Sequence, residues 1–254
     1  MLDIRNVSKS YGNIQALKDV SFSVHASEFV CVVGPSGCGK TTLLKCMSGL
    51  LAPTTGRVSI NGKPVSSPPP EMGMVFQDYR ASLYPWSNVQ DNVMLPLRHM
   101  KIPKSEREDR VTRALKDVRL EGFRRHYPWQ LSGGMQQRVA IARALAYQPQ
   151  ILLMDEPFAS VDAQTRAELE DLILEVKHKI GKTVLLVTHD IDESVYLSDR
   201  IVVLTRSPTL VREIISTNLP HPRHQITTKE LPEFGHLRAH VYRLINETAH
   251  SLAA

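Results

Sequence analysis

The sequence predicts an α/β fold built on a largely parallel sheet, and three observations carry that prediction. Residues 34–41 fit the pattern G-x-x-x-x-G-K-[ST] at every fixed position. An apolar run at residues 151–154 ends in two carboxylates, Asp155 and Glu156. Between these two segments, residues 88–148 have helix-forming patterns. We therefore expect an α/β core with an inserted helical subdomain. Residues 1–30 and 56–66 alternate short strands with turns, which predicts an antiparallel β subdomain beside the core.

The glycine-rich loop at residues 34–41 lies between two predicted elements. Residues 29–33 are a short apolar run typical of a buried parallel strand, and residues 42–47 begin a helix. Glycines let backbone N–H groups close around phosphates where a Cβ atom would obstruct. Lys40 would bring a positive charge to the β- and γ-phosphates, and the Thr41 hydroxyl suits Mg²⁺. This context predicts a P-loop NTPase site rather than a chance glycine-rich turn.

The adjacent carboxylates of Asp155 and Glu156 follow the buried strand at residues 151–154. Such a strand delivers them to the C-terminal edge of the sheet, where α/β folds bind their ligands. Asp155 suits the organisation of Mg²⁺, and Glu156 suits a general base that deprotonates an attacking water. The alternative is a strand end solvated by two acids, and the preceding P-loop weighs against it.

A second glycine-rich turn lies at residues 131–134 and opens a predicted helix at residues 132–147, which ends before Pro149. The start of that helix offers another set of backbone N–H groups to an anion. Two phosphate-binding elements in one chain suggest that a nucleotide is closed between two surfaces.

With these motifs in order, the chain resembles the ATP-binding-cassette (ABC) ATPases. Residues 131–138 match the family signature, and Gln77 matches the Q-loop. Asp162 matches the D-loop, His189 the switch histidine, and Tyr11 the aromatic residue that stacks on adenine.

The resemblance implies that two copies pair head to tail, so that each ATP lies between one P-loop and the partner's signature. It implies catalytic roles for Glu156, His189 and Gln77, and Mg²⁺ contacts from Thr41, Gln77 and Asp155. The implied nucleotide contacts are Tyr11, Gly34, Ser36, Gly37, Cys38, Gly39, Lys40, Thr41, Thr42, Ser132, Gly133, Gly134, Gln136 and Asp162.

Length and composition suit one nucleotide-binding domain over residues 1–254, with a C-terminal tail from about residue 206. The net charge of +5 and the pI near 9.1 could suggest nucleic acid, but the basic residues are scattered, so no nucleic-acid partner is expected. The spacing of Cys31, Cys38 and Cys46 fits neither a metal site nor a disulfide framework. We expect reduced thiols, with Cys38 sensitive to alkylation because it lies in the phosphate loop.

The start of the chain shows no signal segment, and no apolar run approaches the roughly 20 residues of a membrane span. A membrane role must therefore come through a transmembrane permease, which would place the chain at the cytoplasmic face of the membrane. Prolines at residues 208–232 and the segment at residues 84–93 resemble the nitrate/sulfonate/taurine importer branch, which implies an external solute-binding protein.

Local patterns make further predictions. Asn61-Gly62 predicts a hairpin turn, and Ser105 with Glu108 predicts a capping box for a helix at residues 106–118. An amphipathic helix is expected at residues 163–179, followed by buried strands at residues 183–188 and 201–205.

Other classes of protein remain as alternatives, namely a non-transport ABC ATPase of DNA repair or of the ribosome, and an ATP-dependent regulatory protein. A DNA-repair ATPase needs a coiled coil between phosphate loop and signature, and a ribosome-associated one carries two cassettes. A purely regulatory sensor has no need of an intact Glu156 and His189.

Overall fold

The computed structural model describes residues 1–250, and its centre is a six-stranded sheet in the order β10-β9-β3-β8-β7-β6. Neighbouring strands are parallel from β9 to β6, while β10 runs antiparallel to β9 at the edge. The strands are β3 (Phe29–Val33), β6 (Met72–Val75), β7 (Ile151–Asp155), β8 (Thr183–Thr188), β9 (Arg200–Leu204) and β10 (Val211–Ser216). The predicted α/β fold with a largely parallel sheet is confirmed.

Both faces of this sheet are buried, which explains why its strands are apolar at nearly every position. In β3, Phe29, Cys31 and Val33 belong to one hydrophobic core, whereas Val30 and Val32 belong to a second. The alternation follows from the two-residue period of a strand. The two cores fix the sheet from both sides, so the loops at its C-terminal edge start from rigid positions.

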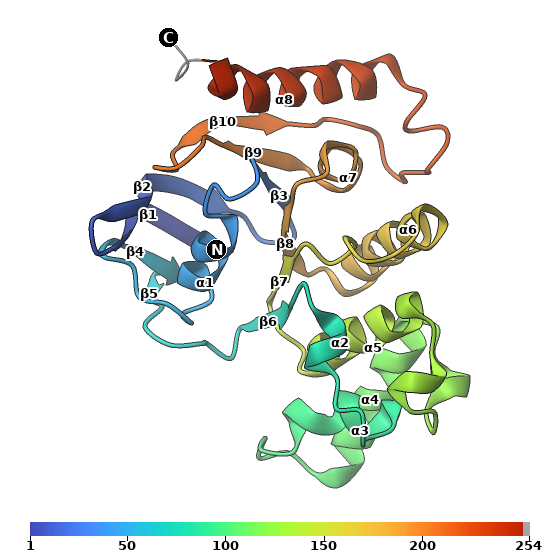
Figure 1. The fold of residues 1–254 in the computed structure, drawn as a ribbon. Coiled ribbons are helices and arrows are strands. Elements are labelled where there is room, and N and C mark those ends of the chain that lie inside the picture. The colour runs from blue at the N-terminus through green and yellow to red at the C-terminus, as the bar shows by residue number, and fades with distance from the viewer. Residues whose placement is uncertain (251–254) are drawn as a thin grey trace.

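Different elements cover the two faces of the sheet (Figure 1). Helix α1 shares a core with the antiparallel sheet, whereas α5 to α8 contribute to the core on the opposite face. The helices are α1 (Lys40–Met47), α2 (Tyr79–Ser82), α3 (Val89–Met94), α4 (Lys104–Asp117), α5 (Gly133–Ala146), α6 (Ala163–Ile180), α7 (Ile191–Leu197) and α8 (Pro232–His250). Short 3-10 turns lie at Leu95–Leu97, Glu121–Phe123 and Pro128–Gln130.

The second sheet is antiparallel and has the strand order β2-β1-β4-β5. Its strands are β1 (Leu2–Tyr11), β2 (Ile14–Val24), β4 (Thr55–Ile60) and β5 (Lys63–Pro64). The predicted hairpin turn is confirmed between β4 and β5, where Asn61 and Gly62 have φ values of 50° and 79°. Two successive positive φ angles are what a two-residue type I′ turn requires.

The helices α2 to α5 lie between β6 and β7 in the chain and form the lower part of the molecule in Figure 1. This helical insert begins at Tyr79, earlier than residue 88, because Asp78 caps α2 by accepting the backbone N–H of Ala81. The buried residues Val111 and Leu115 of α4 pack into the core that α5 shares.

The predicted capping box at Ser105 and Glu108 is wrong. Helix α4 begins at Lys104, so Ser105 lies within its first turn, and the N-cap is Pro103. Pro103 has φ −56° and ψ 152°, and its carbonyl accepts the first helical hydrogen bond, from Arg107. Proline fixes φ near the helical value, so the helix can start directly after it without a side-chain cap.

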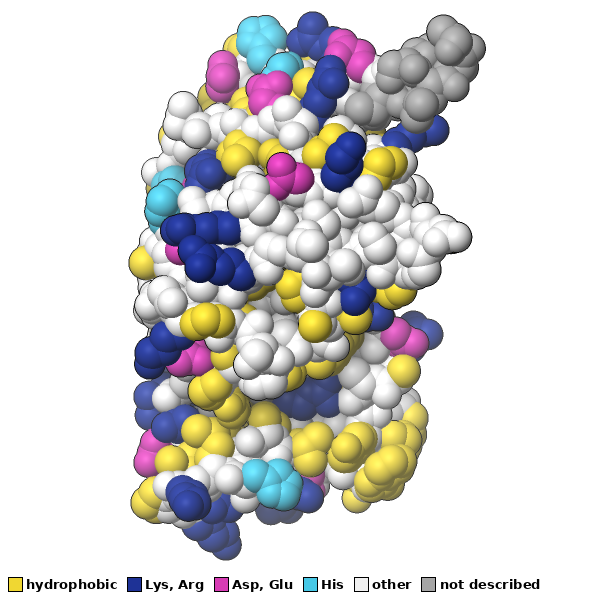
Figure 2. Space-filling view, turned by 90° about the vertical axis from the view of Figure 1, so that its left-hand side faces the viewer, with side chains coloured by type: hydrophobic (Ala, Val, Ile, Leu, Met, Phe, Trp, Pro, Cys, Tyr) yellow, Lys and Arg dark blue, Asp and Glu magenta, His cyan; other side chains and the backbone are white. Residues whose placement is uncertain are grey.

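Charged side chains of both signs are interspersed over the face in Figure 2. Its hydrophobic side chains gather in the lower part, at the height of the helical insert in Figure 1. Among the helices of residues 1–250, none combines the length and apolar character that crossing a membrane requires.

Candidate nucleotide site

The phosphate loop connects β3 to α1 and has the backbone shape that its glycines allow. Gly37 has φ 73°, and a Cβ atom added to it would have no neighbour within 4 Å; Gly39 has φ 106° at the N-cap of α1. A side chain at Gly34 would lie 3.0 Å from the Cβ of Leu204, so this position needs glycine because strands approach closely. Ser36 and Gly37 are exposed at the tip of the loop. The loop therefore presents backbone, not side chains, to a ligand.

Lys40 lies in the first turn of α1, and its ammonium group is folded over the phosphate loop. The Nζ atom donates to the carbonyl oxygens of Gly34 at 2.9 Å and Pro35 at 3.0 Å. The side chain is buried, so these carbonyls replace its lost hydration. Thr41 is exposed next to it and Thr42 is half-buried. A phosphate group in the loop would meet a positive charge that is already held in place.

The structure does not support the predicted alkylation sensitivity of Cys38. Its side chain is 2% exposed and belongs to the core beneath the loop. Burial raises the pKa of the Cys38 thiol above its usual value, although the nearby Lys40 charge opposes this. A buried thiol with a raised pKa has little reactive thiolate. The Cys38 side chain therefore points away from the space that a phosphate would occupy, into the core.

Asp155 is the last residue of β7 and provides a buried carboxylate beside the loop. Burial raises the pKa of its carboxyl group, whereas a hydrogen bond with Thr41 and the charges of Lys45 and Lys40 lower it. Its Oδ1 atom is buried and accepts no hydrogen bond within residues 1–250. An orphaned carboxylate oxygen next to a threonine hydroxyl is a donor set that fits Mg²⁺.

Three residues predicted to be catalytic meet at one oxygen atom. The Glu156 Oε2 atom accepts a hydrogen bond from Gln77 Nε2 at 3.0 Å and lies 3.2 Å from His189 Nδ1. Gln77 follows β6, Glu156 follows β7 and His189 follows β8, so adjacent parallel strands deliver all three to one edge. Glu156 has a positive φ of 41°, and its N–H donates to the Val187 carbonyl. A non-glycine residue in this conformation at a polar cluster points to function.

The signature segment forms the start of α5, as predicted. Ser132 is the N-cap, and its Oγ atom accepts the backbone N–H of Met135 at 3.3 Å. A Cβ atom on Gly133 would lie 3.1 Å from the Tyr79 hydroxyl. A Cβ atom on Gly134 would lie 2.3 Å from the Thr165 Cγ2 atom of α6. Helix α5 therefore rests directly on the first turn of α6, and only glycine permits this approach.

Replacing Gly134 with alanine should destabilise the chain, because the new methyl group overlaps the Thr165 methyl group. We expect a loss of about 1–3 kcal/mol, the usual cost of overpacking. Thr165→Ser keeps the hydroxyl group but removes the methyl group, so the double variant should regain most of that stability. Urea unfolding of the four proteins measures this. Equal losses with threonine and serine at position 165 would contradict the contact.

Of the remaining residues predicted to contact the nucleotide, one has an exposed side chain and two form hydrogen bonds within the chain. Tyr11 is 50% exposed at the end of β1, with Lys9 Nζ 5.5 Å from its ring centroid. Asp162 caps α6 by accepting the N–H and hydroxyl of Thr165, and hydrogen bonds from the Thr165 backbone and side chain hold the pKa of Asp162 below its usual value. Gln136 instead donates its amide to the carbonyls of Pro128 and Leu131. Gln136 thus stabilises the turn before the signature within its own chain.

The phosphate loop and the signature lie in different parts of the molecule. Figure 1 shows α1 beside the antiparallel sheet, apart from α5 in the helical insert. The two predicted phosphate-binding elements of one chain therefore lie apart from each other.

An ion-pair network next to His189 was not predicted from the sequence. Arg166 of α6 donates to the Asp190 carboxylate at 3.0 Å and approaches Glu193 at 3.7 Å. Arg166 lies more than 20 residues from both partners in the sequence, and no local pattern indicates their contact.

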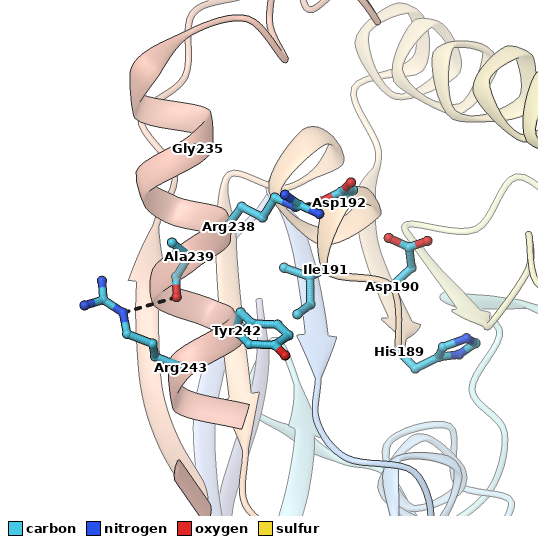
Figure 3. Close-up of a pocket in the computed structure, with 9 residues that line it drawn as sticks. All are labelled: His189, Asp190, Ile191, Asp192, Gly235, Arg238, Ala239, Tyr242 and Arg243. Atoms are coloured by element: carbon cyan, nitrogen blue, oxygen red, sulfur yellow. Dashed lines mark hydrogen bonds and ion pairs between the residues drawn. The ribbon is translucent and has the colours of Figure 1, made fainter. Parts of the chain in front are cut away.

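The C-terminal helix also lies close to the switch histidine. A cavity of about 740 Å³ separates α8 from the turn at His189, and Figure 3 shows its lining residues. Arg238 of α8 crosses the gap to Asp192 at 2.6 Å. His189 and Asp190 lie on the side of this turn away from α8 (Figure 3). The tail thus leaves the Glu156–His189 contact free.

Comparisons with known proteins agree on one family. A sequence model described as ABC transporter matches residues 17–159. An uncharacterised ABC transporter ATP-binding protein of Methanocaldococcus jannaschii is 49% identical over 91% of this chain and 87% of its own length. The aliphatic sulfonates import ATP-binding protein SsuB of Bacillus thuringiensis is 41% identical, covering 90% and 92%. The nitrate transport protein NasD of Klebsiella oxytoca is 37% identical, covering 97% of both chains.

Solved structures show the same fold. Clostridium perfringens cbiO1, part of an ABC transporter complex, superposes with a TM-score of 0.80 at 28% identity, covering 97% of this chain and 94% of that one. A dimeric ATP-binding cassette in a post-hydrolysis state, bound to ADP and Pi, gives a TM-score of 0.73 at 37% identity. That match covers 85% of this chain and 98% of the other.

Proposed function

The chain belongs to the ABC transporter ATP-binding family, and from this membership we propose that it energises uptake of a small solute through a separate permease. The relatives named for sulfonate and nitrate transport favour a small anion of that chemistry as the solute. An external solute-binding protein is the third partner in this proposal. The chain then works at the cytoplasmic face of the membrane, held there by the permease.

The observation that carries the ATP-hydrolysing part of this proposal is the convergence of Gln77 and His189 on one carboxylate oxygen of Glu156. Glu156 acts as the general base, which orients the attacking water and takes its proton. Gln77 holds the carboxylate and senses whether the site is filled. His189 completes the cluster from the neighbouring strand and contacts the γ-phosphate. An ATP sensor without turnover has no need of this arrangement.

The phosphate loop holds the nucleotide in position for this chemistry. Backbone N–H groups of residues 37–42 and the Lys40 ammonium bind the β- and γ-phosphates. Tyr11 supplies an exposed ring for the adenine. Thr41 and Asp155, with Gln77, would hold Mg²⁺, which neutralises phosphate charge when it is bound. The orphaned Oδ1 atom of Asp155 supports this assignment.

The active form is a head-to-tail dimer in which the signature of one copy closes on the nucleotide of the other. The separation of α1 from the helical insert in Figure 1 supports this arrangement, because the two predicted phosphate-binding elements of one chain lie apart. The related cassette with ADP and Pi is itself dimeric. Ser132 and the N–H groups of Gly133 and Gly134 then contact the partner's γ-phosphate.

The permease docks at the groove between the sheet edge and the helical insert. This groove has a volume of about 440 Å³ and includes Phe76, next to Gln77, as well as Tyr84 and Leu95. Beside it, Tyr84 stacks on Trp86 with ring centroids 5.0 Å apart, and Trp86 is 72% exposed. Exposed aromatic rings are typical anchors of protein interfaces. A permease segment in this groove would sense the site through Gln77.

We expect the permease to raise the ATPase rate of the chain and to contact Trp86. A photo-reactive amino acid in place of Trp86 should crosslink to a cytoplasmic loop of the co-purified permease. The same group at Ile226 is a matched control, because Ile226 is 70% exposed but lies in the tail. Crosslinks from position 226 alone would move the docking surface away from the groove. Vesicles that contain the complex should take up an alkanesulfonate or nitrate only when ATP and the binding protein are present.

A further inference from the structure

We infer that Arg166 is a positioning residue for hydrolysis, which fixes the turn that carries His189 and ties it to α6. The inference rests on the proposed function, because it assigns Arg166 a role that acts through His189. Arg166 does not touch Glu156 in any contact seen within residues 1–250. Its effect must therefore pass through the backbone on which His189 lies.

The turn after β8 is held by a closed set of hydrogen bonds. The Thr188 hydroxyl donates to Glu193 Oε2 at 2.7 Å and accepts the N–H of Asp190 at 3.0 Å. Asp190 caps α7 by accepting the N–H of Glu193 at 3.1 Å. His189 lies between the two bonded residues, so its backbone has little freedom while these bonds persist.

Arg166 joins this turn to α6 through two carboxylates. Its Nη1 atom donates to Asp190 Oδ2 at 3.0 Å, and its Nε atom lies 3.7 Å from Glu193 Oε1. That Nε atom is buried and has no hydrogen-bond partner within residues 1–250. The side chain of Glu193 is only 5% exposed, whereas those of Arg166 and Asp190 are about 30% exposed. The guanidinium group thus supplies the positive charge between two carboxylates that are partly or fully withdrawn from water.

The ionisation of Glu193 makes this charge important at neutral pH. Burial raises the pKa of Glu193 to about 7, and the negative charges of Asp190 and Glu170 add to the rise. The Thr188 hydrogen bond and the Arg166 charge lower it. The charged groups that face Glu193 are therefore Asp190 at the start of its own helix and Glu170 and Arg166 on α6. Arg166 is the cation that stabilises the ionised carboxylate there.

The same turn of α6 contacts the signature helix. The Arg166 N–H donates to the Asp162 carbonyl, and Asp162 holds Thr165 by two hydrogen bonds. Thr165 is the residue against which Gly134 packs. A continuous set of contacts therefore runs from the start of α5 through α6 to His189. In the proposed dimer, α5 meets the partner's nucleotide and His189 meets the chain's own, so Arg166 links the two sites.

The first test is Arg166→Gln in the purified full-length chain. We expect kcat to fall by about 10- to 100-fold, the loss typical of a misplaced catalytic group, while ATP binding stays close to wild type. Arg166→Lys keeps one positive charge near Asp190 and should recover part of the rate. The matched control is Glu175→Gln, which breaks the exposed 2.7 Å ion pair of α6 with Arg119. The control should keep the wild-type rate.

The second test combines Arg166→Gln with His189→Ala. If Arg166 acts through His189, the double variant should be no slower than His189→Ala alone. Losses that multiply would overturn the inference. If His189→Ala itself keeps the wild-type rate, the role proposed for His189 fails instead, so the two failures are distinguishable.

Melting temperatures of the variants distinguish a loss of positioning from a loss of folded protein. If Arg166→Gln does not fold, Asp190→Asn decides, because asparagine still caps α7 but lacks the charge that Arg166 binds. We expect Asp190→Asn to lower kcat like Arg166→Gln, with a melting temperature close to that of the wild type. A wild-type rate in Asp190→Asn would overturn the inference.

Discussion

Replacing Glu156 with glutamine should leave ATP binding intact and lower the hydrolysis rate by about 10²–10⁴-fold. Glutamine has the shape of glutamate, and its carbonyl oxygen can still accept the hydrogen bond that Gln77 donates to Glu156 Oε2. It cannot take a proton from water. The variant should therefore bind MgATP, close the dimer and remain there, because the step that reopens it is blocked.

Two measurements test this expectation. Single-turnover hydrolysis reports the chemical step, and size-exclusion chromatography with MgATP reports an ATP-stabilised dimer. Glu108→Gln is the matched control, because Glu108 is exposed and its only ion pair within residues 1–250 is with Lys104 on the surface of α4. A wild-type rate in Glu156→Gln would show that another group is the base. A low rate without a stable dimer would place Glu156 in closure rather than in chemistry.

The features that follow from neighbouring residues could be predicted from the sequence. The phosphate loop is an example, because a buried strand, glycines and a helix start all occur within one short segment. Ser132 as the N-cap of α5 is another, since the serine, the two glycines and the apolar helix are adjacent. The type I′ turn at Asn61-Gly62 depends only on two residues that tolerate positive φ.

Local rules failed where a residue next to the motif altered its geometry or where packing came from far away. The capping box predicted at Ser105 does not form, because Pro103 already has the helical φ angle and the helix begins directly after it. The exposure of Cys38 depends on core packing, and Thr209, from the far end of the chain, donates to its carbonyl. Sequence distance conceals such contacts, so the loop position alone gave the wrong expectation.

The contact of Gln77 and His189 with Glu156 could be predicted only in part from the sequence. Each residue follows a strand of the parallel sheet, so its place at the C-terminal edge could be predicted. The order β8-β7-β6, which makes the three strands neighbours, follows from the fold and not from any one motif. The pair of Arg166 with Asp190 has no local signal at all, because it joins a helix side chain to a turn in the next βα unit.

The last prediction tests whether Ser132 acts on the neighbour's ATP. One chain carries Lys40→Ala and loses the ammonium group that is folded over the phosphate loop. The other carries Ser132→Arg, which puts a cation at the start of α5, where the helix dipole is already positive. The Lys40→Ala homodimer loses charge-assisted hydrogen bonds of roughly 1.5–3 kcal/mol each and should be inactive. The Ser132→Arg homodimer should be inactive because its added cation repels the positive end of the α5 dipole and takes the place of a phosphate contact. Melting temperatures check that each chain folds without its original side chain.

Mixed dimers, isolated with two affinity tags, then separate the two arrangements. In a head-to-tail dimer, one site collects both lesions and the other pairs an intact phosphate loop with an intact signature, so hydrolysis should return. If each chain used its own Ser132, both sites would carry one lesion and no activity would return. The decisive control pairs a doubly substituted chain with wild type. If the dimer is head to tail, both sites of this control dimer carry one lesion and it should be inactive. If each site is formed within one chain, the site of the wild-type chain is intact and should stay active. Activity in this control, but not in the first mixed dimer, would overturn the head-to-tail arrangement.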